Sequence, residues 1–135
     1  MNEKLFELEI ISPDRQFYDG EVHFVEMTTS EGDIGVYKDH IPLTCILVPG
    51  MVKIYEGDSD TPKKAIVHAG FVEILQDKVT IMAEVAEWPE EIDLNRAEEA
   101  RIRAERRINE AGEGVNIERA EAALRRSLAR IESLK

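Results

Sequence analysis

Arginines near the end of the chain are the residues whose type and spacing could do chemistry. Arg96, Arg103 and Arg107 follow one another at intervals of seven and four positions, which places them on one face of a helix. Arg126 and Arg130 are four positions apart and would share a face of a second helix. Guanidinium groups donate parallel, charge-assisted hydrogen bonds that suit phosphate oxygens. If the two helices pack antiparallel, these side chains could therefore converge on one anion such as a triphosphate.

The same arginines also fit a solvated helix surface. Glu99 precedes Arg103 by four positions, and Glu121 precedes Arg125 by four, which is the spacing of surface ion pairs along a helix. On residue types alone, the solvated surface is favoured over the anion site.

Other reactive residue types are isolated. Cys45 is the only cysteine, so an internal disulfide framework is excluded, and its apolar neighbours favour a core thiol. His23, His40 and His68 are too far apart for a local metal-ligand motif and are expected in turns or on the surface. The sequence also contains no nucleophile-elbow motif and no phosphate-loop motif. It therefore predicts no catalytic residues and no metal site.

A shift in composition at Trp88-Pro89 divides the chain into two units. Residues 1–88 hold 17 acidic and 7 basic side chains, whereas residues 89–135 hold 11 acidic and 10 basic ones, nine of them arginine. All aromatic, histidine and cysteine residues lie in the first part. Such a shift is typical of two structural units, so we expect domains at 1–88 and 89–135.

The whole chain of 135 residues carries a formal net charge of −11. This acidity argues against nucleic-acid binding. No apolar run is long enough to cross a bilayer, and the first ten residues do not resemble a signal peptide. The sequence therefore predicts a soluble, cytosolic protein.

The first unit is predicted to be all-β. Residues 6–10 alternate apolar and acidic side chains, as a strand with one solvated face does, and residues 52–55, 65–68 and 79–82 are further strand candidates. Glycine-containing motifs are expected to form the turns between strands. These are Asp19-Gly20, Glu31-Gly32-Asp33, Pro49-Gly50 and Glu56-Gly57-Asp58, with Gly32-Asp33-Ile34-Gly35 as a tight turn. Short strands at this spacing predict a sandwich or flattened barrel.

The second unit is predicted to be an antiparallel two-helix hairpin, which makes the chain α+β. Asp93 and Asn116 would cap the two helices, and Ala111-Gly112-Glu113-Gly114 would form the bend between them. Each helix carries one narrow stripe of small or apolar residues. The stripes are Ala97, Ala100, Ala104, Ile108 and Ala111, and Ile117, Ala120, Leu124, Leu128 and Ile131. Neither stripe buries enough surface for an isolated helix, so the hairpin must dock on the β unit or on a partner, and its position should be changeable.

Five motifs in this order resemble the epsilon subunit of bacterial F-type ATP synthases, over nearly the whole chain. They are residues 11–15 with 18–21, residues 32–36, residues 40–43, residues 49–54 and residues 69–73. The sequence departs from the family at Tyr37-Lys38-Asp39, where the family often has a Leu-Pro-Gly-like turn. This departure alters a loop and not the expected fold.

The resemblance implies a non-catalytic subunit of the central rotor stalk that requires no cofactor. It implies a peripheral position at the cytoplasmic face of the bacterial membrane, without insertion into it. The partners it implies are the gamma subunit and the c-ring, and the catalytic alpha and beta subunits when the hairpin is extended. Such a subunit couples proton or sodium flow to ATP synthesis and restrains ATP hydrolysis through its mobile hairpin.

Some members of this family bind ATP on the folded hairpin through the motif Ile/Leu-Asp-x-x-Arg-Ala, which residues 92–97 match. The implied ATP site consists of Glu87, Ile92, Asp93, Arg96, Ala97, Arg103, Arg126 and Arg130. The arginines would neutralise the phosphates, while Asp93 and the backbone near Ile92 and Ala97 would hold the base and ribose. ATP bound only to the folded form would stabilise that form. Alternatively, Asp93 simply caps the helix, or the chain is a free-standing ATP-sensing protein; a nucleic-acid-binding helical module and an enzyme are less favoured.

Overall fold

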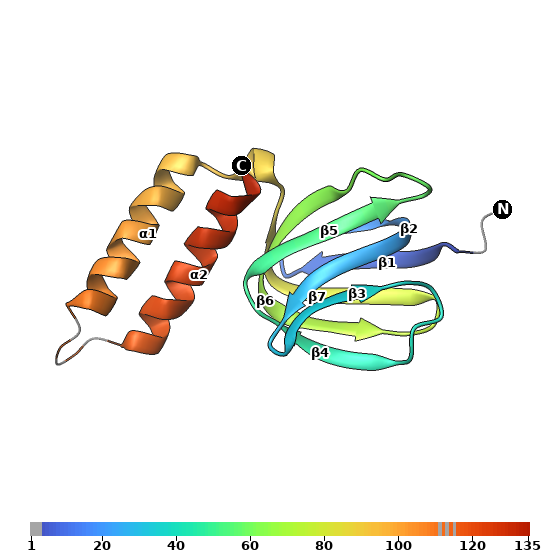
Figure 1. Cartoon of the computed structure of the whole chain (residues 1–135), viewed down its shortest axis with the longest axis horizontal. Helices are drawn as coiled ribbons and strands as arrows, with labels where there is room; N and C mark the ends of the chain where they lie inside the picture. Colours follow the sequence, from blue (N-terminus) through green and yellow to red (C-terminus); the bar gives the residue numbers. More distant parts are fainter. Residues whose placement is uncertain (1–3, 111, 113, 115) are drawn as a thin grey trace.

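The computed structural model describes residues 4–110, 112, 114 and 116–135, and shows a β unit beside a helical hairpin (Figure 1). The predicted α+β class is confirmed. In chain order the elements are β1 (Phe6–Ser12), β2 (Arg15–Thr29), β3 (Gly32–Val36), β4 (Leu43–Leu47), β5 (Gly50–Glu56), β6 (Lys63–Ile74), β7 (Lys78–Glu87), the 3-10 helix η1 (Pro89–Glu91), α1 (Leu94–Asn109) and α2 (Ile117–Ser133).

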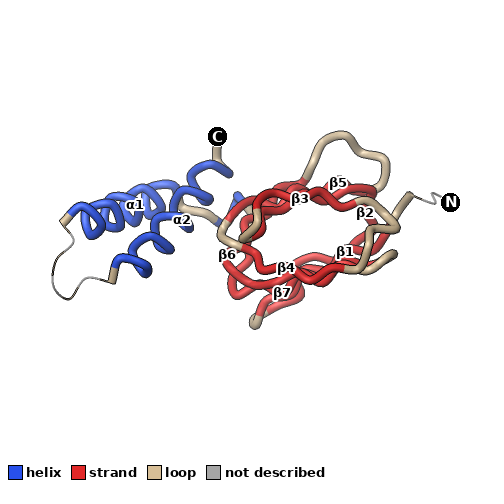
Figure 2. The backbone as a smooth tube through the Cα atoms, turned by 60° about the horizontal axis from the view of Figure 1, so that its bottom comes forward, coloured by secondary structure: helices blue, strands red, loops and turns tan. Residues whose placement is uncertain are grey.

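The strands form one seven-stranded sheet that closes on itself as a flattened barrel. β1 pairs antiparallel with β2 and parallel with β7. β7 pairs with β6, whose first half pairs with β5 and whose second half pairs with β4. β4 and β5 both return to β2, which closes the sheet. Figure 2 shows the two flattened sides, with β3 and β5 on one and β1, β4 and β7 on the other.

The barrel interior is the hydrophobic core. The alternation predicted for residues 6–10 places Phe6, Leu8 and Ile10 inside, with the acidic residues outside. Burial of such side chains is the main favourable term in folding. Cys45 is partly buried and packs against this core, as expected for a structural thiol.

β6 reverses its inward face near its middle. Val67 points into the core before this point, and Val72 points into it afterwards. The reversal occurs at Ala69 and Gly70, whose φ angles are 62° and 138°, and a Cβ atom on Gly70 would collide with the Met82 carbonyl oxygen. Glycine is therefore required here. Before the reversal, the buried His68 lies on the outer face of the sheet, where α2 contacts β6.

Two of the predicted turns are wrong. Asp19 and Gly20 lie within β2, which continues through them because it pairs first with β1 and then with β5. Gly32 to Gly35 belongs to β3, so the turn precedes it at Ser30-Glu31. A Cβ on Gly35 would lie 2.6 Å from Cζ of Phe24. The lack of a side chain at Gly35 therefore leaves room for the Phe24 ring and does not serve a turn. The bend at Pro49 and the turn at Gly57-Asp58 agree with the sequence prediction.

The two helices lie side by side, with α2 against β5 and β6 (Figure 1). Both predicted caps are confirmed: Asp93 Oδ1 accepts a hydrogen bond from the Arg96 N–H at 3.2 Å, and Asn116 Oδ1 accepts one from the Arg119 N–H at 3.0 Å. Ala111 and Glu113 of the predicted bend lie outside the described residues. None of the helices in the described ranges is long and apolar enough to cross a membrane.

The predicted stripes are only partly correct. Ala97 and Ala104 of α1 and Ala120 of α2 are buried. Leu128, which was predicted to be buried, is 46% exposed, and the neighbouring Ser127 is buried instead. The reason is that α2 packs against both α1 and the strands, so its buried surface is not a single stripe of fixed helical period.

Candidate functional site

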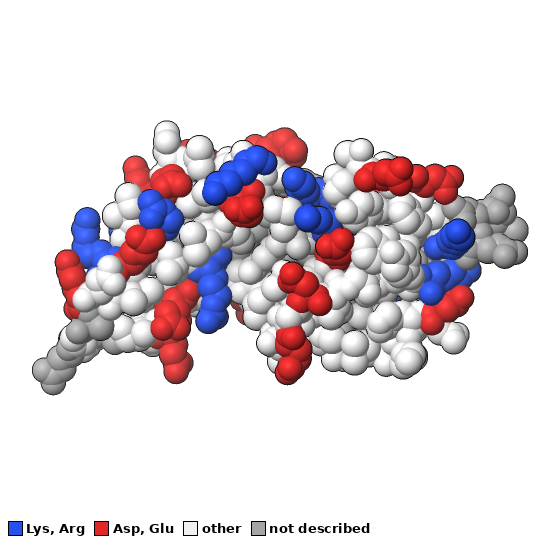
Figure 3. All heavy atoms as spheres, in the orientation of Figure 1, with Lys and Arg blue, Asp and Glu red and all other residues white. Residues whose placement is uncertain are grey.

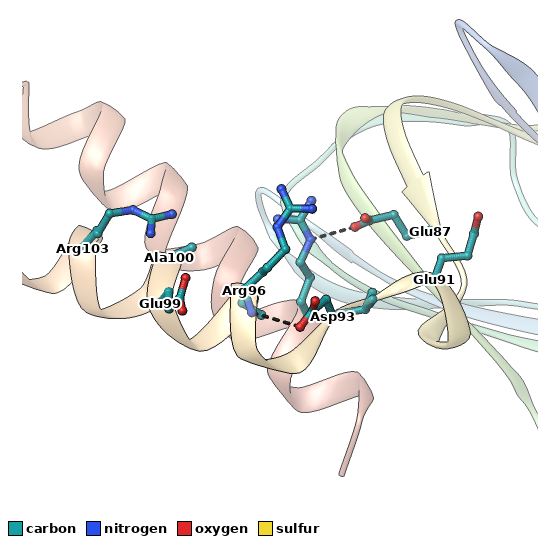
Figure 4. A pocket seen from close by; sticks show the side chains of 10 residues that line it. Glu87, Glu91, Asp93, Arg96, Glu99, Ala100 and Arg103 are labelled. Carbon is teal, nitrogen blue, oxygen red and sulfur yellow. Dashed lines mark hydrogen bonds and ion pairs between the residues drawn. The ribbon is translucent and has the colours of Figure 1, made fainter.

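A cleft of about 400 Å³ lies where the end of β7, η1, α1 and α2 meet. This volume falls within the usual range for small-molecule sites. Ten residues line the cleft, and they are Glu87, Glu91, Ile92, Asp93, Arg96, Ala97, Glu99, Ala100, Arg103 and Arg130. Figure 4 shows Arg96 on α1 near Glu87 and Asp93 at the joint between the two units, and Arg103 farther along α1.

The cleft brings together seven of the eight site residues predicted from the sequence. These are Glu87, Ile92, Asp93, Arg96, Ala97, Arg103 and Arg130. Arg126 is not among the lining residues, although it is close enough to His68 to affect the imidazole electrostatically. Arg107, which shares the face of Arg96 in the sequence pattern, does not line the cleft either.

Sequence reasoning missed three lining residues, Glu91, Glu99 and Ala100. Glu99 and Ala100 stand three positions after Arg96 and Ala97, so the helical period itself was a usable signal for them. No pattern in the sequence indicated that Glu91 would line the cleft, because its position depends on the path of η1.

Three of the four carboxylates that line the cleft have partners, and the fourth, Glu99, has none among the described residues. Glu87 Oε1 accepts a hydrogen bond from Arg130 Nε at 2.8 Å. Glu91 Oε1 is 2.8 Å from Arg15 Nη2 on the β unit, and Asp93 accepts from the backbone as a helix cap. By contrast, the guanidinium groups of Arg96 and Arg103 have no carboxylate partner within the part of the chain that the structure describes. The cleft therefore offers two uncommitted cationic side chains together with one uncommitted carboxylate, that of Glu99.

Glu87 links the β unit to the hairpin. Its Oε1 atom is 2.8 Å from His68 Nε2 on β6 as well as 2.8 Å from Arg130 Nε on α2. Burial acts to raise the pKa of Glu87, but the hydrogen bonds from Arg130 and His68 outweigh it and hold the pKa below its ordinary value. Glu87 therefore remains a carboxylate at neutral pH.

His68 contradicts its sequence prediction. It was expected in a turn or on the surface, but it lies within β6 and is 2% exposed. Burial lowers the pKa of His68, and the nearby positive charges of Arg130 and Arg126 lower it further. At neutral pH the imidazole is therefore uncharged.

The unpaired guanidinium groups of Arg96 and Arg103 are the candidate anion contacts of the cleft. Arg96 and Arg103 are seven residues apart on α1, which corresponds to roughly 10 Å along the helix axis. Such a separation suits an elongated polyanion better than a single small ion. Among the described residues there is no cluster of three metal-ligating side chains.

The structure is a β barrel joined to a helical hairpin, with a cleft at the joint, which is the architecture of a two-domain protein. The β-sandwich domain of the ATP synthase delta/epsilon chain matches residues 5–89, and the long α-helix domain of the same chain matches residues 90–135. The protein therefore belongs to the ATP synthase delta/epsilon chain family. The resemblance inferred from the sequence motifs is confirmed, and with it the assignment as a non-catalytic subunit of the ATP synthase.

Relatives cover nearly the whole chain. The ATP synthase epsilon chain of Caldanaerobacter subterraneus subsp. tengcongensis is 42% identical over 130 residues, which cover 96% of this chain and 94% of the relative. The epsilon chain of Halalkalibacterium halodurans is 41% identical over 124 residues, covering 91% and 92%.

Two solved structures share the fold. A chain of the Euglena gracilis mitochondrial ATP synthase superposes with a TM-score of 0.85 at 22% identity, covering 97% of this chain and 82% of that one. A chain of the Tetrahymena thermophila mitochondrial ATP synthase central stalk and c-ring superposes with a TM-score of 0.61 at 14% identity, with 96% of each chain covered. At these identities the similarity shows a shared fold and nothing more.

Proposed function

We propose that the chain serves in the central rotor stalk of a bacterial ion-translocating F-type ATP synthase, at the cytoplasmic face of the membrane. In this proposal the β unit binds the gamma subunit and the c-ring. The hairpin binds ATP while it is folded on the β unit, and restrains ATP hydrolysis when it extends toward the catalytic alpha and beta subunits. The observation that carries the regulatory part is the cleft at the joint between the two units.

The position of the cleft makes ligand binding depend on hairpin docking. Glu87 belongs to the β unit, Arg96 and Arg103 belong to α1, and Arg130 belongs to α2. These groups surround one space only while the hairpin is folded. A ligand that contacts all of them binds the folded form alone and stabilises it by mass action. The free guanidinium groups favour the phosphates of ATP as that ligand.

A row of exposed apolar side chains supports docking of the β unit on another subunit. Ile46 on β4 pairs with Phe71 on β6, Phe71 pairs with Met82 on β7, and Met82 pairs with Ile11 on β1. Ile46 is 65% exposed, and Phe71 and Met82 are also exposed. A contiguous exposed apolar surface is typical of a subunit interface. We assign this apolar row to the gamma subunit.

Calorimetric titration of the full chain with ATP tests the regulatory part. We expect a binding isotherm for the wild type, a much weaker one for Arg103→Ala, and no change for Arg125→Ala, which alters an exposed arginine of α2 outside the cleft. Absence of heat at millimolar ATP contradicts the proposed ATP site.

Co-purification with the gamma subunit tests the rotor part. We expect Phe71→Ser to lose gamma and Ile102→Ser, an exposed apolar position on α1, to retain it. Full retention by Phe71→Ser contradicts the assigned docking surface. ATP binding by a wild-type chain that captures no gamma subunit would favour the free-standing ATP sensor instead.

A further inference from the structure

His68 occupies an unusual position for a titratable side chain. It lies on the outer face of β6 and is 2% exposed. Its Nε2 atom is 2.8 Å from Glu87 Oε1. Its Nδ1 atom is buried without a hydrogen-bond partner among the described residues. Only one imidazole nitrogen therefore has a partner while the hairpin is docked.

Glu87, the single hydrogen-bond partner of His68, also binds the hairpin. The same Oε1 atom of Glu87 accepts a hydrogen bond from Arg130 Nε at 2.8 Å. Among the described residues, Glu87–Arg130 is the one ion pair that joins α1 or α2 to a strand. One carboxylate oxygen thus connects the imidazole on the β unit to the guanidinium on α2.

Charges of both signs lie near His68. β7 contributes the negative charge of Glu87, whereas α2 contributes the positive charges of Arg130 and Arg126. On β5 the nearest charged residue along the ladder, Lys53, pairs with Lys64, four positions before His68 on β6. A positive charge on the buried imidazole would be attracted by Glu87 and repelled by Arg130 and Arg126, with burial as the largest effect against it.

We propose that His68 is a proton-sensitive latch for the hairpin: α2 docks on β6 while the imidazole is neutral, and protonation of His68 releases it. The proposal rests on the two-state hairpin of the proposed function, but it does not require ATP binding.

The physical reason is the cost of a charged imidazole in the docked state. A neutral imidazole with its proton on Nε2 donates to Glu87 and leaves Nδ1 as a bare acceptor. Protonation adds an N–H group at Nδ1 that has no acceptor, and a buried unpaired donor is destabilising. The added charge also repels Arg126 and Arg130. Undocking exposes both nitrogens to water and separates the charges.

The direction of the pH dependence follows from linkage. Burial has the largest effect on the pKa of His68 in the docked form and lowers it; the hydrogen bond to Glu87 opposes this shift, the two arginines add to it, and the pKa stays below its ordinary value. The docked form therefore binds a proton more weakly than the undocked form. Docking is therefore unaffected above the ordinary histidine pKa of about 6.5. As the pH falls below that value, the docking equilibrium declines by up to about tenfold per pH unit, until the docked-state pKa is reached.

Hydrogen exchange followed by NMR on the full chain without ATP tests the latch. We compare protection factors of α2 amides at pH 7.5 and pH 5.5 in the wild type, His68→Gln and His40→Gln. The glutamine amide keeps a hydrogen-bond donor but does not titrate, and His40 lies in the loop between β3 and β4. We expect protection to fall by up to about tenfold at pH 5.5 in the wild type and in His40→Gln, and to stay constant in His68→Gln. Equal protection at both pH values in the wild type, or an equal fall in His68→Gln, overturns the proposal.

A direct titration keeps the test valid even where His68→Gln does not fold. The imidazole resonances of the wild type give the pKa of each of the three histidines. We expect the pKa of His68 to lie below the ordinary histidine value of about 6.5 and to rise in Arg126→Gln, which removes a nearby positive charge. A His68 pKa at or above that value overturns the latch. Both experiments omit ATP, so a failed latch with normal ATP heats is distinguishable from a failed ATP site.

Discussion

The β unit and the hairpin bury different kinds of side chain. The barrel core contains fully buried branched residues such as Leu8, Ile54 and Ile81. The buried residues of the helices are all small, and they are Ala97, Ala104, Ala120, Ser127 and Ser133. A buried leucine or isoleucine contributes about 1.5–3 kcal/mol, whereas one methyl group contributes only about 0.8 kcal/mol. The barrel therefore has its own source of stability, while the hairpin depends on docking.

The residues at the joint between the two regions are attached to the barrel. Trp88 stacks on Phe17 of the barrel with ring centroids 4.2 Å apart. Arg15 donates hydrogen bonds to the Ala86 carbonyl oxygen and to Glu91. The chain is thus fixed to the barrel as far as Glu91, and rotation of the hairpin should occur after this residue. Figure 3 shows acidic and basic side chains intermixed over the helices, as on a solvated helix surface.

The largest loss of stability is expected from a substitution in the core of the β unit. Ile54→Ala removes a fully buried side chain and should lower the free energy of unfolding by about 2–5 kcal/mol. Urea denaturation followed by circular dichroism measures it. Ile46→Ala, at an exposed position on the neighbouring barrel surface, is the control and should change stability by less than about 0.5 kcal/mol. Similar losses for both variants would mean that the barrel core does not carry the stability.

A smaller effect is expected at the contact between the two regions. Arg130→Ala leaves the half-buried Glu87 carboxylate without its guanidinium partner, which should cost about 1–3 kcal/mol. Because this contact holds the hairpin, the loss should appear as weaker hydrogen-exchange protection of α2 with unchanged protection of the barrel strands. Arg125→Ala is the matched control. Equal loss of protection in both regions would show that they unfold as one unit.

Substitutions of the two helix-capping residues distinguish a capping role from a ligand-binding role. Asp93→Ala and Asn116→Ala each remove one cap of the same geometry, and each should destabilise its helix by about 1 kcal/mol. Asp93 also lines the cleft, whereas Asn116 does not. ATP calorimetry with Asp93→Asn, which retains a capping side chain, tests the second role. Unchanged ATP affinity in Asp93→Asn would leave Asp93 as a cap alone.

The smallest effect is expected on the exposed side of α1. Arg101 pairs with Glu98 at 3.0 Å and with Glu105 at 2.8 Å. Ion pairs between solvated side chains on a helix contribute little to stability and weaken with salt. Arg101→Gln should therefore change thermal stability only slightly at low salt and not measurably at high salt. A large change would mean that surface charge, rather than docking, holds the hairpin together.

Local features of the sequence predicted much of this architecture. The alternation in residues 6–10 and the caps at Asp93 and Asn116 depend on neighbouring residues, so they were predictable. The seven cleft residues found in advance came from a motif resemblance, because residue types alone favoured a solvated surface. Their role in binding ATP stays a prediction.

The failed predictions involve pairing across long sequence distances. Asp19-Gly20 has the composition of a turn, but β2 passes through it because β1 and β5 pair with β2 on either side. Leu128 lies on the predicted stripe, but α2 packs against two neighbours and leaves it exposed. Periodicity specifies which residues share a face, and it does not specify which neighbour that face meets.

By itself the sequence determined two units, one rich in strands and one in helices, because composition, periodicity and caps are properties of short segments. Only the tertiary structure decided that Glu87 would meet both His68 and Arg130, residues 19 and 43 positions away. Such a contact depends on the closure of the barrel and on the angle at which α2 docks. No local pattern encodes either one, since both arise when distant surfaces exclude water together.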